Sequence, residues 1–276
     1  MLRDRVVTAI GLVAALLAAL FWLPPLGWTV LAAAALTAAA WEWAGFARAG
    51  RGGRMLYALA TAGVGLAAAF GTGLAEGSVG VLALTPLYGL ALAFWVIGAP
   101  LWLARQPAAL PAPLVLAVGW IVLLPTFLAL VQLRNIGPGT LLAFMAIVWV
   151  ADIAAYYFGR RFGRSKLAPK VSPGKTWAGL YGALAATAVY AAAWIGLFRG
   201  AIPAAVRDLA WSAVWMIALV EVLAVLSVFG DLLESAMKRQ AGLKDSGSVL
   251  PGHGGILDRI DALTPVLPTA ALVNMV

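Results

Sequence analysis

Apolar runs long enough to cross a lipid bilayer recur along nearly the whole sequence. A bilayer core about 30 Å thick requires about 20 apolar residues in each helical span. Mean hydropathy is +0.96 and only 11% of the 276 residues are charged, which is too little polar surface for a water-soluble domain of this length. The sequence therefore predicts an all-α fold, that of a polytopic integral membrane protein.

We expect about nine transmembrane helices, one for each apolar segment. The segments are 6–23, 26–46, 55–73, 80–104, 112–133, 139–158, 177–198, 208–229 and 262–276. With the N-terminus in the cytoplasm, alternate loops carry 16 of the 19 lysine and arginine residues, in agreement with the positive-inside rule. The last segment has fifteen residues, about 22 Å of helix, which is short for a full span.

The net charge of +8 raises the question of nucleic-acid binding, but the distribution of the charge argues against it. The basic residues lie in short loops between apolar segments, where the positive-inside rule accounts for them. We therefore expect no nucleic-acid partner. Cysteine is absent from the chain, which excludes disulfides and thiolate chemistry.

Two connections on the predicted cytoplasmic side are long and polar. The first, 159–176, carries six basic residues and no acid, and the second, 230–261, carries five of the eleven acids. A cationic loop beside clustered carboxylates suits a phosphate substrate with a divalent metal. We expect N-terminal transmembrane helices over 1–138 and a catalytic membrane region over 139–276, with a polar site on the cytoplasmic side.

Two pairs of carboxylates in the second connection have the same spacing. Asp231 and Glu234 would share one face of a helix, and Asp258 and Asp261 repeat the i, i+3 spacing. Such aspartates suit Mg²⁺, which keeps waters and takes its remaining ligands from substrate phosphates. The alternative is a solvated helix end, in which Asp258 and Asp261 pair with Arg259.

The segment PGHGG at 251–255 contains the only histidine of the chain, His253. Glycine permits a positive φ and a close approach of the backbone to a ligand. A helix beginning near Ile256 would direct free N–H groups towards this segment, which is the arrangement of an anion site. His253 could then donate to a phosphate, or it could simply cap the turn.

The segment KVSPGKT at 170–176 is basic, but it lacks the leading glycine of a Walker A loop. Its Ser-Pro-Gly run predicts a rigid turn, after which Lys175 opens the next apolar segment. A lysine at a helix start is unfavourable unless an anion lies nearby, so Lys175 is a candidate for binding phosphate. Alternatively Lys175, like Lys238, Arg239 and Lys244, only meets anionic lipid.

Three acids lie inside apolar segments, where burial of a carboxylate is costly and functional roles are common. Asp152 lies near the cytoplasmic end of its segment, so it could reach the same site as the two polar connections. Glu42 and Glu221 are equally well explained as functional groups or as hydrogen-bonding groups between helices.

The second connection also carries an extended pattern. From Ser235 to Asp261 it reads S-x2-K-R-x4-K-D-x-G-x2-L-P-x-H-G-G-x2-D-R-x-D, unbroken over 27 residues. This pattern resembles that of the phosphatidate cytidylyltransferases, also called CDP-diacylglycerol synthases. The segments GDLLES and SPGKTWAG and the acid in ADIAAYYFGRRFG resemble the same family. The resemblance covers the chain from about residue 149, and it departs at Ala178, where many members have Glu or Gln.

The resemblance implies a membrane enzyme that converts CTP and phosphatidic acid into CDP-diacylglycerol and pyrophosphate. It also implies Mg²⁺ as cofactor, with room for a second metal ion, and a homodimer. It assigns the metal to Asp231, Asp258 and Asp261, which would be catalytic together with Lys175. The substrate-binding residues would be Ser172, Lys238, Arg239, Lys244, His253 and Asp152. We expect a bacterial inner-membrane protein surrounded by membrane lipid, with its N-terminus and site loops in the cytoplasm.

Other classes of protein stay open on the sequence. A transporter would suit buried acids and nine spans, but the carboxylates cluster in a cytoplasmic loop and not near the bilayer midplane. A CTP-dependent lipid kinase would move the γ-phosphate of its nucleotide, whereas a cytidylyltransferase moves CMP. A CDP-alcohol transferase is disfavoured because its D-G-x2-A-R run is absent. A purely structural scaffold gives no reason for the 27-residue pattern.

Overall fold

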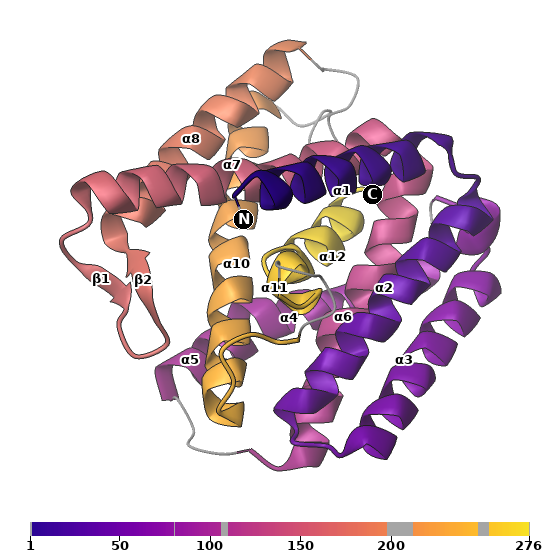
Figure 1. Cartoon of the computed structure of the whole chain (residues 1–276). Coiled ribbons are helices and arrows are strands. Elements are labelled where there is room, and N and C mark those ends of the chain that lie inside the picture. Colours follow the sequence, from indigo (N-terminus) through magenta and orange to yellow (C-terminus); the bar gives the residue numbers. More distant parts are fainter. Residues whose placement is uncertain (1, 80, 106–109, 198–211, 248–253, 276) are drawn as a thin grey trace.

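The computed structural model of the protein describes residues 2–79, 81–105, 110–197, 212–247 and 254–275. Its regular structure is almost entirely helical, as predicted (Figure 1). The longer helices are α1 (Leu2–Trp22), α2 (Pro25–Phe46), α3 (Arg51–Gly71), α6 (Ala112–Ile136), α7 (Pro138–Phe162), α8 (Trp177–Leu197) and α10 (Ser212–Ala241). The shorter elements are η1 (Leu74–Glu76), η2 (Leu82–Leu84), α4 (Thr85–Ala93), η3 (Phe94–Gly98), α5 (Ala99–Arg105), β1 (Lys166–Ala168), β2 (Ser172–Thr176), α11 (Leu257–Ile260) and α12 (Leu263–Val273).

Seven helical stretches in the described part of the chain are long and apolar enough to cross a membrane. They are α2, α3, the stretch Leu82–Arg105, α6, α7, α8 and α10, and they coincide with seven of the nine predicted segments. The other two segments correspond to shorter apolar helices, Val13–Trp22 within α1 and Leu263–Val273, which is α12. The membrane class is therefore confirmed, whereas the count of nine is not.

The outer surface of the bundle is suited to lipid. Large apolar side chains point outward along several helices, and Trp22, Leu56 and Val189 are 83%, 72% and 71% exposed. A water-soluble protein rarely leaves so many large apolar groups uncovered. In a bilayer the same groups face hydrocarbon, while the helices satisfy their own backbone hydrogen bonds.

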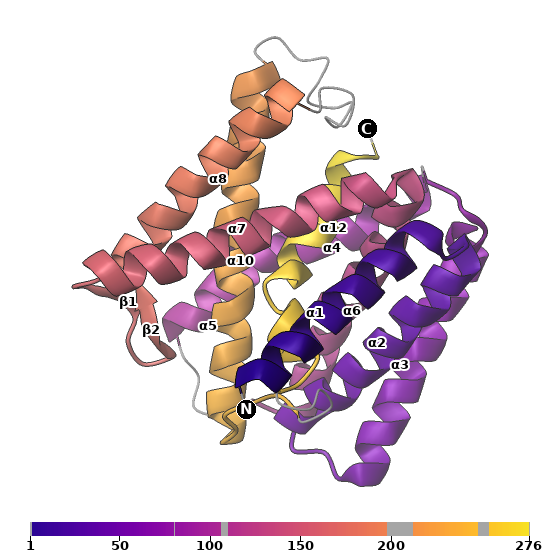
Figure 2. The same ribbon diagram turned by 45° about the horizontal axis from the view of Figure 1, so that its top comes forward.

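The last predicted apolar segment forms helix α12. It has 11 residues, about 16 Å of helix, which is roughly half the thickness of a bilayer core. Every residue from Leu263 to Ala271 is buried, and the helix packs against α6, α10 and α4 (Figure 2). It is therefore a core helix surrounded by protein, and it joins the predicted N-terminal and C-terminal regions in one hydrophobic core.

Helix α10 is longer than an apolar span requires. Its 30 residues give about 45 Å of helix, so it extends beyond a bilayer core about 30 Å thick. The predicted polar connection over 230–261 is helical at Asp231–Ala241, where α10 continues beyond its apolar part. Because this stretch is helical, Asp231 and Glu234 do have the predicted i, i+3 spacing on one helix.

The connection 159–176 contains an antiparallel hairpin formed by β1 and β2, so the fold is not purely α-helical. The register pairs Lys166 with Thr176. The turn lies at 169–171, and the Ser-Pro-Gly run belongs to β2 instead of forming the predicted turn. Proline is compatible with an edge strand, and both strands of an isolated hairpin are edges.

The hairpin connects α7 to α8, which pack against each other along their length. It contacts α7, α8 and α10 through β2, and Figure 1 shows it beside the polar part of α10. Both views place α11 and α12 between α10 and α6 (Figures 1 and 2). The hairpin of the first polar connection and the helix α11 of the second therefore both pack against α10.

Candidate active site

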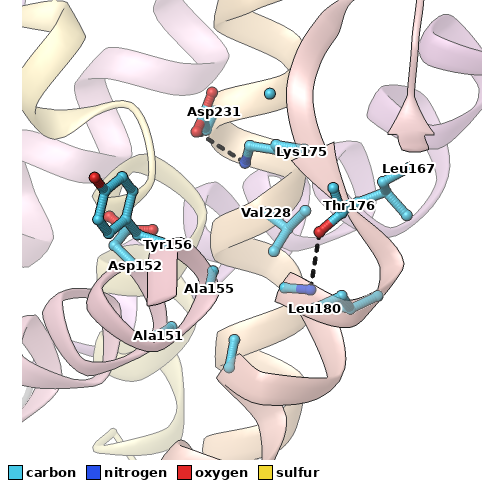
Figure 3. A pocket seen from close by; sticks show the side chains of 13 residues that line it. Ala151, Asp152, Ala155, Tyr156, Leu167, Lys175, Thr176, Leu180, Val228 and Asp231 are labelled. Atoms are coloured by element: carbon cyan, nitrogen blue, oxygen red, sulfur yellow. Dashed lines mark hydrogen bonds and ion pairs between the residues drawn. The ribbon is translucent and has the colours of Figure 1, made fainter. Parts of the chain in front are cut away.

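A cavity of about 260 Å³ opens where the hairpin meets α7, α8 and α10. Its charged lining residues are Asp152 on α7, Lys175 on β2 and Asp231 on α10, and small or apolar residues form much of the rest. Figure 3 shows Lys175 directed towards Asp231, with Asp152 and Tyr156 on the neighbouring helix. Three separate elements thus bring charged groups to one small cavity.

Lys175 and Asp231 join the hairpin to α10. The Lys175 Nζ atom lies 2.8 Å from the Asp231 Oδ2 atom, and the two side chains are 22% and 34% exposed. The anion expected beside Lys175 is therefore present as a carboxylate of the chain itself. A partly exposed ion pair contributes little to stability, so each group can exchange its partner for a charged ligand at small cost.

Thr176 determines how α8 follows the hairpin. Its Oγ1 atom accepts a hydrogen bond of 3.1 Å from the amide of Gly179 (Figure 3). This is the bond of an N-cap residue to the third residue of a helix, so the helix begins directly after β2. Because Thr176 is fixed in this way, the preceding Lys175 is held at the rim of the cavity.

A second group of ion pairs lies where α10 meets α11. The Lys238 Nζ atom lies 2.6 Å from an oxygen of Glu234 and 2.6 Å from an oxygen of Asp258. The side chains of Lys238, Glu234 and Asp258 are only 13%, 4% and 11% exposed. A single buried cation therefore neutralises one carboxylate of its own helix and one carboxylate of α11.

Both oxygens of Asp258 are occupied by donors of the chain. Oδ1 accepts from Lys238, and Oδ2 accepts from the amide of Ser246 at 3.0 Å, the hydroxyl of Ser246 at 3.0 Å and the amide of Gly255 at 2.9 Å. Burial alone would raise the pKa of Asp258, but the hydrogen bonds from Lys238, Gly255 and Ser246 lower it to about 2. Asp258 is therefore ionised and holds the residues before α11 in place.

Asp261 has the opposite electrostatic environment. Burial and the negative charge of Asp231 raise the pKa of Asp261 to about 7, although the amide of Ala262 donates a hydrogen bond of 2.8 Å to its Oδ1 atom. Asp231 and Asp261 are therefore carboxylates that repel each other across the junction of α10 and α11. A cation bound between them would relieve this repulsion.

The two ion-pair clusters and the neighbouring Asp261 contain more carboxyl groups than lysines. If all were ionised, four carboxylates and two lysines would leave a net charge of −2; they are Asp231, Glu234, Asp258, Asp261, Lys175 and Lys238. Within the described part of the chain, however, no three His, Cys, Asp or Glu side chains are gathered as a ready metal site. Asp258 is turned to Lys238, so the donor set that fits Mg²⁺ is Asp231 and Asp261, completed by water or phosphate.

Comparison with known proteins gives a consistent result over the full length. The sequence model of the cytidylyltransferase family matches residues 3–276. The phosphatidate cytidylyltransferase of Pseudomonas aeruginosa is 40% identical over 285 aligned residues, which cover 98% of this chain and 96% of that protein. The chain belongs to the cytidylyltransferase family. A second member, the phosphatidate cytidylyltransferase of Haemophilus influenzae, is 35% identical over 97% of this chain and 96% of that protein.

Similarity to the cytidylyltransferase family is unevenly distributed. The phosphatidate cytidylyltransferase of Brucella suis is 45% identical, but over 124 residues that cover 45% of this chain and 42% of that protein. The resemblance predicted from the C-terminal motifs is confirmed, and the family match also includes the N-terminal half. The N-terminal helices are therefore part of the family architecture, although their sequence alone reads as generic apolar helix.

The remaining residues that the family pattern indicates take no part in the two ion-pair clusters of the described residues. Asp152 is exposed and lines the cavity, whereas Ser172 is half-buried on β2. Arg239 and Lys244 are exposed, outside the two ion-pair clusters. His253 lies outside the described residues. Ala178, where many family members have Glu or Gln, is half-buried in the first turn of α8.

Two of the residues that build this site have little or no local sequence signal. Ser246 falls on an unspecified position of the 27-residue pattern, yet it donates two hydrogen bonds to Asp258. Thr176 is visible only as the residue before an apolar segment.

Glu42 is visible as an acid in an apolar helix, and the structure places it against Ser246 and α11. Glu221, by contrast, accepts a hydrogen bond of 2.9 Å from Thr187 on α8, so it has the helix-to-helix role.

Proposed function

We propose that the protein is an integral membrane phosphatidate cytidylyltransferase, which transfers CMP from CTP to phosphatidic acid and releases pyrophosphate. Similarity over nearly the full length to two proteins of this name supports the activity. The structural observation that carries the proposal is the cavity flanked by Lys175 and Asp231, where a charged hairpin meets the end of a membrane helix. Such a position gives a soluble nucleotide and a membrane lipid access to the same groups.

The chemistry requires no protein nucleophile. An oxygen of the phosphatidate monoester forms a bond to the α-phosphorus of CTP, and the bond from that phosphorus to the bridging oxygen of the β-phosphate breaks. The electron pair of the broken bond leaves with pyrophosphate. The difficulty is to bring two anions together and to stabilise the charge that develops, so positioning and electrostatics are the main contributions of the protein.

Lys175 is suited to compensate the nucleotide phosphates. Its ammonium is partly exposed at the cavity, and its partner Asp231 can turn to another cation when phosphate arrives. Lys238 has a different environment, because two carboxylates bury it and hold it in place. We therefore assign Lys175 to the phosphates and Lys238 to the support of Asp258. Ser172, Arg239, Lys244, His253 and Asp152 stay proposed contacts around the substrates.

The metal assignment follows the donor set. Asp231 and Asp261 would hold Mg²⁺, whose remaining ligands would be water and phosphate oxygens. When bound, the ion neutralises phosphate charge and makes the α-phosphorus more electrophilic. The family resemblance also assigned the metal to Asp258. In the structure Asp258 instead keeps the backbone ahead of Asp261 in place, through its bonds to Ser246 and Gly255. A second metal ion and a homodimer are further parts of the proposal, as is a cytoplasmic location of the site.

The test uses purified protein in detergent, phosphatidic acid in mixed micelles and CTP labelled either at the α- or at the γ-phosphate. We expect lipid labelled only from α-labelled CTP, release of pyrophosphate, and loss of both with EDTA that excess Mg²⁺ restores. Transfer of the γ-label would instead identify a lipid kinase. No labelled lipid with either nucleotide, from well-folded protein, would contradict the proposed activity.

A further inference from the structure

Glu42 is a fully buried carboxylate that lies outside the cavity and outside the motifs of the C-terminal half. It belongs to α2, one turn before the helix ends at Phe46, and is 1% exposed. Its Oε1 atom accepts a hydrogen bond of 3.0 Å from the amide of Ile256, and its Oε2 atom accepts one of 2.9 Å from the amide of Leu257. A residue of the N-terminal half thus binds the backbone at the beginning of α11.

Ser246 connects Glu42 to Asp258. The Ser246 hydroxyl lies 2.9 Å from an oxygen of Glu42 and 3.0 Å from an oxygen of Asp258. A serine hydroxyl has one proton, so it donates to one of these two carboxylates at a time. Because the amide of Ser246 also donates to Asp258, the serine stays beside Asp258 whichever acceptor its hydroxyl uses. Glu42, Ser246 and Asp258 therefore belong to one hydrogen-bond network.

Glycine makes room for the Glu42 carboxylate on both sides. A Cβ atom at Gly247 or at Gly255 would overlap the carboxylate of Glu42, and at Gly255 it would also overlap the Ser246 hydroxyl. The absence of side chains at these two positions lets the backbone approach the carboxylate closely. Two of the three glycines of the 27-residue pattern, Gly247 and Gly255, are thus explained by Glu42, which lies 204 residues before Ser246 in the chain.

The end of α2 also binds the end of α10. Arg48 donates a hydrogen bond of 3.0 Å from its guanidinium to the carbonyl of Gln240, in the last turn of α10. Its backbone is left-handed, with φ of 56°, and its amide bonds to the carbonyl of Gly45 at 2.9 Å, as in a helix C-terminal cap usually made by glycine. Helix α2 therefore contacts the residues before and after the segment that leads from α10 to α11.

We propose that Glu42 is a positioning residue for the reaction, which orients Asp258 and Asp261 through Ser246 and the amides of Ile256 and Leu257. This inference rests on the proposed function, because it gives those aspartates a role in CMP transfer. Glu42 touches no substrate in this arrangement; it fixes the backbone that carries Asp258 and the proposed metal ligand Asp261. Its loss therefore lowers the turnover number and leaves the affinity for CTP, to which Lys175 contributes from the hairpin, nearly unchanged.

The test compares Glu42→Gln with Glu221→Gln, which removes the charge of another glutamate in an apolar helix with no contact to the site among the described residues. Both proteins are assayed for CMP transfer per folded molecule, with folding followed by circular dichroism and gel filtration. We expect kcat of Glu42→Gln to fall at least about tenfold and KM for CTP to stay within about twofold, while Glu221→Gln keeps both values. Unchanged kcat in Glu42→Gln would overturn the inference.

A double-mutant cycle with Ser246→Ala separates positioning from a general loss of packing. If Glu42 acts through Ser246, the double variant is no more than about twofold slower than the slower single variant, because residues in one network are not additive. Multiplied effects would overturn the route through Ser246. Should Glu42→Gln not fold, Ser246→Ala alone decides, and a normal kcat there contradicts the inference. A wild-type protein that transfers no CMP would overturn the proposed function as well, whereas an active wild type with unaffected variants overturns only this inference.

Discussion

Lys238 on α10 and Asp258 on α11 form an ion pair of 2.6 Å between residues that are twenty positions apart in the chain. The same ammonium lies 2.6 Å from Glu234, so one cation neutralises two carboxylates in a largely buried place. Removal of one partner from such a group leaves uncompensated buried charge, which typically costs about 3–5 kcal/mol. The ion pair therefore holds α11 against the C-terminal part of α10.

Replacement of Lys238 by methionine should destabilise the protein and inactivate it. Methionine keeps most of the unbranched side chain but leaves Glu234 and Asp258 facing each other without a cation. We expect the melting temperature in detergent to fall by at least about 5 °C. Arg239→Met is the matched control for stability, because Arg239 is the exposed neighbour on the same helix, and its melting temperature should change little. Equal melting temperatures for the two variants would contradict this account.

Substitutions of Lys175 and Asp231 should lower activity but, unlike Lys238→Met, should hardly change stability. Their side chains are 22% and 34% exposed, so the pair contributes at most about 1 kcal/mol to stability. Each nevertheless faces the cavity, and loss of one electrostatic group in an active site commonly lowers the rate about 100-fold to 1,000-fold. Lys175→Met and Asp231→Asn should therefore be well folded and nearly inactive. Melting curves and CMP transfer measured on the same preparations test this, and a stable, fully active Lys175→Met would contradict it.

The positions of the apolar helices could be predicted from the sequence, but whether a helix faces lipid or other helices could not. Hydropathy identifies α2, α6 and α10 because an apolar run of sufficient length has few alternatives to a helix in a bilayer. It cannot tell that Leu263–Val273 is enclosed by other helices, because a run buried in protein and a run facing lipid have the same composition. The hairpin β1–β2 was missed because two strands of three and five residues show no usable periodicity.

The site was predicted in part for a similar reason. The pattern around Asp258 singles out the right segment, but its contacts are long-range: Lys238 lies on another helix, and Glu42 contacts Ser246 across 204 residues of sequence. Spacing along a helix can predict that Asp231 and Glu234 share a face. It cannot predict that Lys175 pairs with Asp231 while Lys238 pairs with Glu234 and Asp258, because these ion pairs depend on the packing of the hairpin and α11 on α10.

Asparagine should destabilise the protein at position 258 but not at position 261. The pKa of Asp258 is lowered to about 2, so its charge stabilises the folded state at neutral pH, and Asp258→Asn should cost about 1–2 kcal/mol after allowance for screening. The pKa of Asp261 is raised to about 7, so the folded state opposes its charge. Asp261→Asn should therefore leave the melting temperature at pH 8 unchanged or raise it. Both variants should lose CMP transfer, and a lower melting temperature for Asp261→Asn than for Asp258→Asn would contradict the assignment.

Gly255→Ala should reproduce the loss of Glu42 from the other side of the contact. A Cβ at Gly255 would overlap both the Ser246 hydroxyl and the Glu42 carboxylate, neither of which can withdraw without breaking bonds to Asp258 or to α11. Gly89→Ala in α4 is the control, because nothing lies within 4 Å of a Cβ there. Alanine also favours a helix over glycine by about 1 kcal/mol, so Gly89→Ala should be at least as stable as the wild type and fully active. For Gly255→Ala we expect CMP transfer per folded molecule to fall at least about tenfold; activity equal to that of Gly89→Ala would mean that the close packing around Glu42 does not control the reaction.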